Sequence, residues 1–385
     1  MKPRIPVLIS AAERSGDEHA AGLVREVRAL QPEVEFQGFG GQLLAAAGCK
    51  VHTDLIDMAS MAFGFVRYIP RYARVVRAFD RLLREVRPAA VVLVDSPGLH
   101  FVFARLAKWR GIPVVYYICP QIWAWAPWRR KKVLRYTDLL LTILPFETAL
   151  YENDTVPVKF VGHPLADGLE AHGPEVAAKL RQELAIRDDE RVIGILPGSR
   201  THEVQELMPL FRTILDAMEL APNTRVVVSS FRPSFKNLIS QALDGLTARW
   251  DVVPSDSKTV SRASDFLLVA SGTASLEAAY FERPMLVLYR KGVIEGAFLR
   301  WLAATPHFAL PNILGASLFD GSPAVHEQLC SGSEGVELAA LAKPLLSDGK
   351  PREEAIARLR QIREAYLQPG AARRAASEVV SFLSG

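Results

Sequence analysis

Residues 266–277 have the sequence FLLVASGTASLE, in which five apolar residues run directly into a turn of small residues and then a helix-forming stretch. This order is typical of a buried parallel strand followed by a helix, whose free N–H groups face whatever lies beyond the strand. We expect Ser271, Gly272 and Thr273 to form an anion-binding turn suited to a pyrophosphate. Glu277, one helical turn later, is a candidate acceptor for ribose hydroxyls. The alternative is a plain turn in which Thr273 caps the helix.

A second turn of this kind lies earlier in the same half of the chain. The apolar run Val192–Leu196 is followed by Pro197-Gly198-Ser199-Arg200, which brings an arginine and backbone donors to the same edge of the predicted sheet. An arginine stays charged and can bind phosphate oxygens through two parallel hydrogen bonds. Two anion-facing turns in one domain favour a nucleotide diphosphate as the ligand, although an exposed turn arginine remains the alternative for Arg200.

Short apolar runs alternate with amphipathic stretches along the whole chain, which predicts parallel sheets covered by helices. At 385 residues the chain exceeds what one core usually supports. We expect an α/β protein of two Rossmann-like, doubly wound domains facing a cleft, at 1–165 and 166–350, with a C-terminal helical segment, 351–385, packing back on the first. The predicted strands are 6–11, 90–95, 113–119, 139–144, 158–162, 192–196, 225–230, 265–270 and 285–289; a helix is predicted over 73–86, and a linker over 162–174.

Acidic side chains follow two predicted strands of the first half. Asp95 comes directly after an apolar run, where partial burial would raise the pKa of its carboxyl group and suit it to act as a base. Glu13 and Asp17 follow the first strand and bring two further candidate catalytic carboxylates to the same edge. A helix cap is the alternative for Asp95. His163 ends the last strand of this half, at the expected hinge.

Charge is unevenly distributed along the chain. The net charge is +4, but residues 1–165 carry 22 Lys and Arg against 15 Asp and Glu, or +7, which leaves −3 for the remainder. A basic half indicates an anionic partner such as a membrane surface or a phosphorylated substrate; no recognition motif supports nucleic acid. Residues 61–72 mix apolar, aromatic and basic side chains as membrane-contact segments do, although a buried loop would explain their apolar part. The candidates for membrane contact are Phe63, Phe65, Arg67 and Arg71.

Metal and cofactor sites are not indicated. No Asp-x-Asp pair is present to hold a divalent ion against a pyrophosphate, and three widely spaced cysteines fit neither a zinc site nor a disulfide framework. A reducing compartment suits this cysteine usage. The short apolar run Ile5–Ala12 favours a first strand over a signal sequence, because Glu13 and Arg14 follow at once.

Taken together, these motifs resemble the lipid-A-disaccharide synthases, the glycosyltransferases of family 19. The resemblance spans nearly the whole chain. It rests on motifs in the family's order and approximate spacing: Glu13-x-Ser15-Gly16-Asp17, Gly38-x-Gly40-Gly41, Asp95-Ser96-Pro97, Pro120-Gln121-x-Trp123-Ala124-Trp125, Leu144-Pro145-Phe146-Glu147, Gly162-His163-Pro164-Leu165-Ala166-Asp167, Leu196-Pro197-Gly198-Ser199-Arg200-x-x-Glu203, Ser271-Gly272-Thr273-x-x-Leu276-Glu277 and Leu310-Pro311-Asn312.

The resemblance implies a GT-B fold and an inverting, metal-independent transfer. A UDP-activated diacylglucosamine would react with diacylglucosamine 1-phosphate to give the β-linked disaccharide and UDP, at the inner face of the cytoplasmic membrane; a homodimer is allowed. By position, Asp95 matches the catalytic acid/base, and Asn312 and Glu327 match positions near the nucleotide pocket. The UDP contacts implied are Arg200, Ser271, Gly272, Thr273 and Glu277, and the acceptor-side and hinge residues are Ser15, Gly16, Gln121 and His163.

The chain departs from the family pattern at three places, all in the acceptor-side domain. Where the family usually has Gly-x-x-Glu-Val the chain has Gly64–Tyr68, with Arg67 in place of the acid; Gly98-Leu99-His100 replaces Asp-Phe-Asn; and Ala12 replaces a glycine. Three other functions therefore stay open for this chain: a UDP-sugar transferase with a different acceptor, a sugar-nucleotide epimerase, and a catalytically silent binding protein. A dinucleotide-binding oxidoreductase is disfavoured, since no Gly-x-Gly-x-x-Gly follows the first strand.

Overall fold

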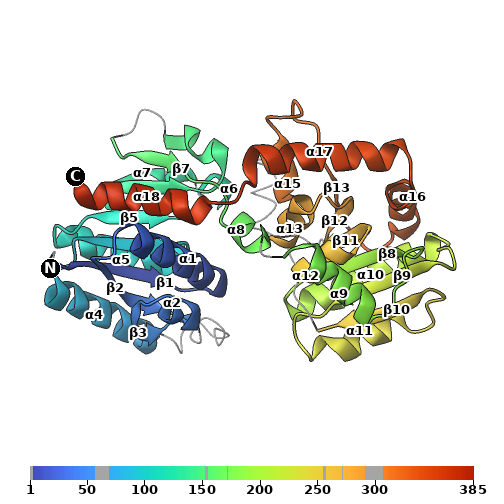
Figure 1. Ribbon diagram of the computed structural model, residues 1–385, viewed down its shortest axis with the longest axis horizontal. Helices are drawn as coiled ribbons and strands as arrows, with labels where there is room; N and C mark the ends of the chain where they lie inside the picture. The colour runs from blue at the N-terminus through green and yellow to red at the C-terminus, as the bar shows by residue number, and fades with distance from the viewer. Residues whose placement is uncertain are drawn as a thin grey trace. The chain divides into compact units, whose positions relative to one another are not determined.

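The computed structural model describes residues 3–56, 69–120, 122–125, 127–151, 155–170, 172–254, 257–270, 272–290 and 307–385. These residues form two compact α/β units, each a parallel sheet covered by helices (Figure 1). Unit 1 is Met1–Pro164 with Pro369–Gly385, and unit 2 is Leu165–Gln368. The predicted pair of doubly wound units is therefore observed.

The described strands of unit 1 form one parallel sheet in the order β3-β2-β1-β4-β5-β6-β7. Its central strand β4 consists of five buried apolar residues, which is why the sequence pattern alone identifies it. The strands are β1 (Ile5–Ala11), β2 (Val34–Gly40), β3 (Lys50–Asp54), β4 (Ala90–Val94), β5 (Val114–Tyr117), β6 (Leu139–Thr142) and β7 (Val158–Phe160).

Unit 2 repeats this arrangement with the order β10-β9-β8-β11-β12-β13. Its strands are β8 (Arg191–Leu196), β9 (Thr224–Ser229), β10 (Arg249–Val253), β11 (Phe266–Ala270), β12 (Met285–Arg290) and β13 (His326–Cys330). In each sheet the chain first adds strands on one side and then crosses to the other, so the direction reverses between β1 and β4 and between β8 and β11. Ligands of open α/β sheets bind at such reversal points, beyond the carboxyl ends of the strands.

The helices follow from apolar stripes at helical spacing. In α4 the buried Val75, Phe79 and Leu83 face the sheet, while Arg74 and Arg81 are exposed. The helices of unit 1 are α1 (Arg14–Leu30), α2 (Gln42–Ala46), α4 (Ile69–Val86), α5 (Pro97–Trp109), α6 (Ile122–Trp125), α7 (Arg130–Tyr136) and α18 (Ala371–Ser384). Those of unit 2 are α8 (Leu165–Glu170), α9 (Pro174–Glu183), α10 (Thr201–Ala217), α11 (Phe235–Leu243), α12 (Ser257–Ala263), α13 (Ala274–Tyr280), α15 (Leu310–Gly315), α16 (Gly335–Leu346) and α17 (Lys350–Tyr366).

The C-terminal helical segment is two helices that serve different units. α17 belongs to unit 2. The helical conformation is then interrupted before α18, where Gly370 has a φ of 92°. α18 lies along α1 in unit 1 (Figure 1), and Arg374 Nε donates to the carbonyl of Val161 at 2.8 Å. The return to the first unit thus begins at Pro369 rather than at 351. The expected linker over 162–174 also contains α8, three of whose residues are buried.

Candidate active site

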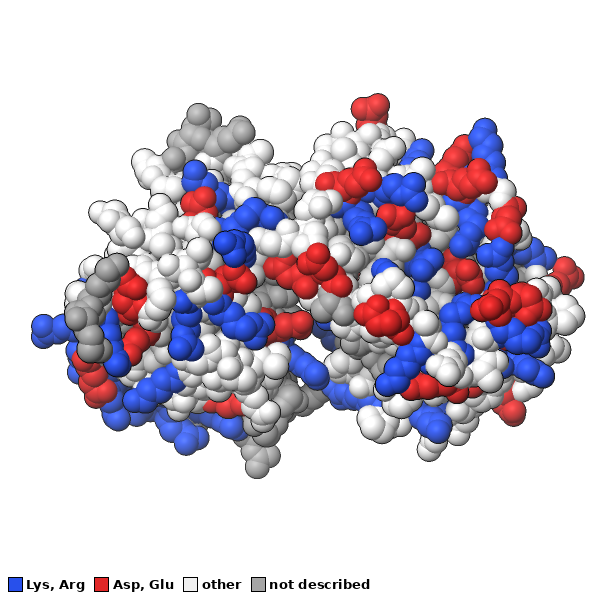
Figure 2. Space-filling model, viewed as in Figure 1, with Lys and Arg blue, Asp and Glu red and all other residues white. Residues whose placement is uncertain are grey.

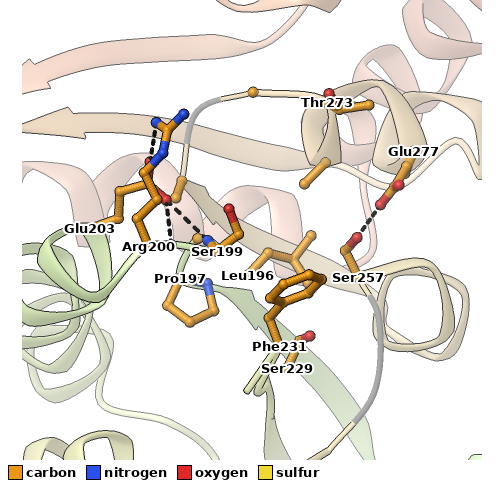
Figure 3. A pocket seen from close by; sticks show the side chains of 14 residues that line it. Leu196, Pro197, Ser199, Arg200, Glu203, Ser229, Phe231, Ser257, Thr273 and Glu277 are labelled. Atoms are coloured by element: carbon orange, nitrogen blue, oxygen red, sulfur yellow. Dashed lines mark hydrogen bonds and ion pairs between the residues drawn. The ribbon is translucent and has the colours of Figure 1, made fainter. Parts of the chain in front are cut away.

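A cavity of about 330 Å³ lies over the carboxyl ends of β8, β9 and β11 in unit 2. This is the point where the strand order of the sheet reverses, and therefore the expected ligand position for this architecture. Figure 3 shows Arg200 and Glu203 on one side of the cavity and Ser257 and Glu277 on the other. The lining residues are Leu196, Pro197, Gly198, Ser199, Arg200, Glu203, Ser229, Phe231, Ser257, Ala270, Gly272, Thr273, Ala274 and Glu277.

The turn after β8 brings Arg200 to the cavity, but two of the backbone N–H groups of this turn already have an acceptor and are not available to a ligand. Glu203 Oε2 accepts hydrogen bonds from the N–H groups of Ser199 at 3.0 Å and Arg200 at 3.2 Å. Glu203 Oε1 lies 3.0 Å from Arg200 Nη1. The turn requires Gly198, where φ is 104° and a Cβ atom would lie 2.4 Å from Glu203. The expectation that Ser199 and Arg200 present backbone donors to a ligand is thus corrected, because Glu203 uses them. The Arg200 side chain itself is 71% exposed.

The turn after β11 keeps open space for a ligand. Gly272 has φ 118°, and a Cβ atom there would meet no atom within 4 Å. Among the described residues, the N–H groups of Thr273 and Ala274 have no acceptor, and Thr273 makes no side-chain cap hydrogen bond. Ser271 lies outside the described residues. Glu277 is buried in the cavity wall, where Ser257 Oγ donates to its carboxylate (Figure 3).

Two lining residues at the carboxyl end of β9, Ser229 and Phe231, are not predicted from the sequence. Ser229 ends the strand, and Phe231 is a large apolar side chain that is 48% exposed. The sequence contains a signal that could have identified them. A strand is predicted over 225–230, and the carboxyl end of a parallel strand lies at the same edge of the sheet as Leu196 and Ala270. An aromatic ring in a cavity that is also lined by an arginine and two acids offers a flat face on which a planar base can stack.

Asn312 and Glu327 do not line this cavity. The buried Asn312 donates through Nδ2 to the carbonyl of Val325 at 3.0 Å and accepts the N–H groups of Ala324 and Val325. Glu327 lies on β13, with Oε1 2.9 Å from His307 Nδ1, and it accepts the N–H group of Phe308 at 3.0 Å. Both side chains hold the segments that flank α15. These contacts position this part of unit 2, and the expectation that Asn312 and Glu327 lie near the nucleotide pocket stays a prediction.

Asp95 leaves β4 at the reversal point of unit 1. The pKa of its half-buried carboxyl is raised from 3.8 to about 6, first by burial and then by the negative charge of Glu13, against the effect of a hydrogen bond from the Ser96 backbone. Its N–H group donates to the carbonyl of Tyr117 at 3.0 Å. A carboxyl group with a pKa near neutrality is suited to accept a proton from a hydroxyl group.

The backbone at this edge of the sheet is strained at three residues, two of them consecutive. Asp95 and Ser96 have φ values of 55° and 49°, and Ile118, after the adjacent strand β5, has 62°. Left-handed conformations of non-glycine residues cost on the order of 1–3 kcal/mol each and gather at functional sites. The hydroxyl group of Ser96 is also buried, with no partner among the described residues. The strand ends of unit 1 therefore have the features of a reaction site.

The acids after β1 have two different roles. Glu13 is exposed and acts on Asp95 through its charge. Asp17 is buried and accepts the N–H groups of Gly41 at 2.6 Å and Leu43 at 3.0 Å, so its carboxylate caps α2. The catalytic role expected for Asp17 stays a prediction beside this capping role. Ser15, on the first turn of α1, is exposed.

The remaining residues expected at a site belong to unit 1. Gly16 is buried against the end of β4, and His163 is buried in unit 1, where burial and then the nearby His19 lower its pKa to about 3. Arg71 is half-buried on the first turn of α4. Outside the described residues lie Phe63, Phe65, Arg67 and Gln121.

Among the described residues, no helix is long and apolar enough to cross a membrane. Within the same ranges, no group of three His, Cys, Asp or Glu side chains is placed to hold a metal ion.

Two doubly wound units, one with a nucleotide-sized cavity at its reversal point, define the GT-B class of glycosyltransferases and related enzymes. Solved structures support this class. The UDP-GlcNAc 2-epimerase of Neisseria meningitidis bound to UDP-GlcNAc is 15% identical with a TM-score of 0.64, covering 99% of both chains. MurG of Acinetobacter baumannii is 13% identical with a TM-score of 0.61, again covering 99% of both chains.

The particular family follows from sequence. The family model described as lipid-A-disaccharide synthetase matches residues 7–378. The lipid-A-disaccharide synthase of Anaeromyxobacter sp. (strain K) is 36% identical over 384 residues, covering 98% of this chain and 97% of that protein. That of Sodalis glossinidius is 34% identical over 366 residues, covering 94% of each. The chain belongs to the lipid-A-disaccharide synthase family and is a glycosyltransferase of lipid A disaccharide synthesis.

Proposed function

We propose that the cavity of unit 2 binds the UDP part of a UDP-activated diacylglucosamine and that Asp95 is the base that activates the acceptor, diacylglucosamine 1-phosphate. The observation that carries the proposal is the pairing of these features with the reversal points of the two sheets. One reversal point carries an arginine, two N–H groups that have no acceptor among the described residues, and an exposed aromatic ring. The other carries a carboxyl group whose pKa is about 6.

Each part of UDP has a chemical match in the cavity of unit 2. Arg200 has five N–H donors, of which Glu203 takes one through Nη1, so donors remain for the diphosphate. The N–H groups of Thr273 and Ala274 add neutral donors for the same oxygens. Glu277 can accept from ribose hydroxyls in place of Ser257, and Phe231 can stack on the uracil ring. Ser271, as part of the same turn, joins this set in the proposal.

The transfer step balances without a further reactant. The acceptor hydroxyl gives its proton to the Asp95 carboxylate while its oxygen bonds to the anomeric carbon of the donor. The bond between that carbon and the diphosphate oxygen breaks on the opposite side, which inverts the configuration to β. UDP leaves with the electron pair, and the charge that develops on it is met by Arg200 and the backbone donors.

The acceptor side is proposed to meet an anionic membrane surface through α4. Lys and Arg side chains gather over the part of unit 1 that α4 covers (Figure 2), and Arg74, Arg77, Arg81 and Arg84 on this helix are exposed. Tyr72 on its first turn donates to the carbonyl of Gly98 at 3.2 Å, which ties the start of α4 to the first turn of α5. Phe63, Phe65 and Arg67, the other expected membrane contacts, precede this helix in the sequence. An anionic cytoplasmic leaflet attracts such basic surfaces, so we infer a peripheral position at its inner face.

The epimerase of Neisseria meningitidis shares the fold, so the test of the proposal has to distinguish transfer of the sugar from isomerisation of the donor. The sequence relationship to synthases over 98% of the chain favours transfer. Incubating the protein with both lipid A precursors and analysing the products by mass spectrometry separates the two. A disaccharide with release of UDP supports the proposal, and an isomerised donor without disaccharide would overturn it.

A further inference from the structure

The imidazole of His100 lies against the backbone of Asp95. His100 is on the first turn of α5 and is completely buried. Its Nδ1 is 2.6 Å from the carbonyl oxygen of Asp95, and its Nε2 is 3.0 Å from Ser10 Oγ on β1. A histidine five residues beyond Asp95 thus connects the strand ends on both sides of the reversal point.

The protonation of the ring follows from its partners. A carbonyl oxygen can only accept, so Nδ1 carries the hydrogen, and Nε2 accepts from the Ser10 hydroxyl group. Burial lowers the pKa of His100 to about 4, so the ring is neutral near pH 7. Because the ring contacts the carbonyl and not the carboxylate of Asp95, this is no serine–histidine–aspartate relay. A buried ring with both nitrogens in use also does not serve as the acceptor base.

A second donor holds the same carbonyl oxygen. The hydroxyl group of the buried Tyr116 donates to Asp95 O at 2.8 Å, so two neutral side chains grip one carbonyl oxygen. Asp95 is in the left-handed region, with φ 55°, as is Ser96, with φ 49°. The φ and ψ angles of a residue determine where its side chain points, and such conformations persist only when the surroundings hold them.

We propose that His100 is a positioning residue: with Tyr116 as second donor, it holds the Asp95 main chain in the left-handed conformation that aims the Asp95 carboxylate at the acceptor. This inference rests on the proposed role of Asp95 as base.

The test compares variants that differ in this donor alone. His100→Leu removes both ring nitrogens, and His100→Asn restores an N–H donor. We expect His100→Leu to lower kcat at least tenfold with the KM of the donor and the affinity for UDP unchanged, and His100→Asn to recover most of kcat. Equal kcat for the leucine variant and the parent would overturn the proposal, as would equally low kcat for the leucine and asparagine variants at matched melting temperatures.

Tyr116→Phe keeps the test usable if His100→Leu does not fold, because it removes one hydroxyl group from the same carbonyl. A several-fold lower kcat with parental UDP affinity supports the proposal that hydrogen bonds to the carbonyl oxygen of Asp95 position this residue, and parental kcat overturns it. In an Asp95→Asn background neither variant should lower kcat further. A full additional loss in that background overturns the positioning role alone, whereas near-parental turnover of Asp95→Asn by itself overturns the role of Asp95.

Discussion

Arg200 and Glu203 form an ion pair of 3.0 Å on the wall of the unit 2 cavity, and the same carboxylate holds the N–H group of Arg200. The arginine is therefore held in place before any ligand arrives, although its side chain remains largely exposed. Preorganised charge of this kind binds phosphate at a smaller entropic cost.

Replacing Arg200 with alanine should weaken UDP binding by about 1.5–3 kcal/mol, the range for a hydrogen bond to a charged group. This corresponds to about a 10- to 150-fold higher Kd by calorimetry. Arg187→Ala is the matched control, since Arg187 forms an exposed ion pair with Asp189 in the same unit but outside the cavity. Equal UDP affinity for the parent and the Arg200 variant would remove this residue from the site.

Asp17 is expected to contribute to stability through its cap on α2. Asp17→Ala leaves the N–H groups of Gly41 and Leu43 without their acceptor, so the free energy of unfolding should fall by about 1–3 kcal/mol in denaturant titrations. Glu18→Ala, at the exposed neighbouring position, should change it by less than about 0.5 kcal/mol. Lost turnover with unchanged stability of the Asp17 variant would support a catalytic role for Asp17 instead.

The pH profile of turnover should report the Asp95 carboxyl. The base works only when it is ionised, so kcat should fall as the pH drops below about 6, the raised pKa of this group. Glu13→Gln removes a nearby negative charge and thereby makes ionisation of Asp95 easier, so the acid limb should move to lower pH. Glu85→Gln, an exposed acid on α4, should leave it in place. An acid limb unmoved by Glu13→Gln would contradict the charge coupling.

Membrane contact through α4 predicts loss of vesicle binding on charge reversal. Arg74→Glu combined with Arg81→Glu should weaken co-sedimentation with anionic vesicles by on the order of tenfold or more, since each basic residue near the surface contributes about 1 kcal/mol. Binding of the parent should also decrease with salt. Lys179→Glu with Lys350→Glu, both exposed in unit 2, is the control. Parental binding of the α4 variant would move the contact elsewhere.

The sequence predicts the central strands better than the outer ones, for a physical reason. β4 and β11 are buried on both faces and appear as unbroken apolar runs. The strands at the sheet edges, β3, β10 and β13, are half exposed and contain polar residues. Because they lack an unbroken apolar run, the apolar pattern does not identify them. β2 was missed as well, because Glu35 and Gln37 alternate with its apolar residues.

The site could be predicted where chemistry follows directly from a strand end, as at Asp95 and Arg200. It could not be predicted where a side chain meets a distant segment. Asp17 finds its partner Gly41 24 residues further along the chain, and His100 contacts Ser10 across 90 residues. Such pairings depend on the packing of the sheet, which motif spacing does not contain.

Turnover of the Asp95→Asn variant tests the central claim most directly. The substitution keeps the shape of the side chain and removes its basicity, and kcat for disaccharide formation should fall by on the order of 10²–10⁴. UDP affinity measured by calorimetry should stay at the parental value, because the proposed UDP contacts all lie in unit 2. Near-parental kcat in this variant would contradict the account and shift the base role to Glu13 or another group of unit 1.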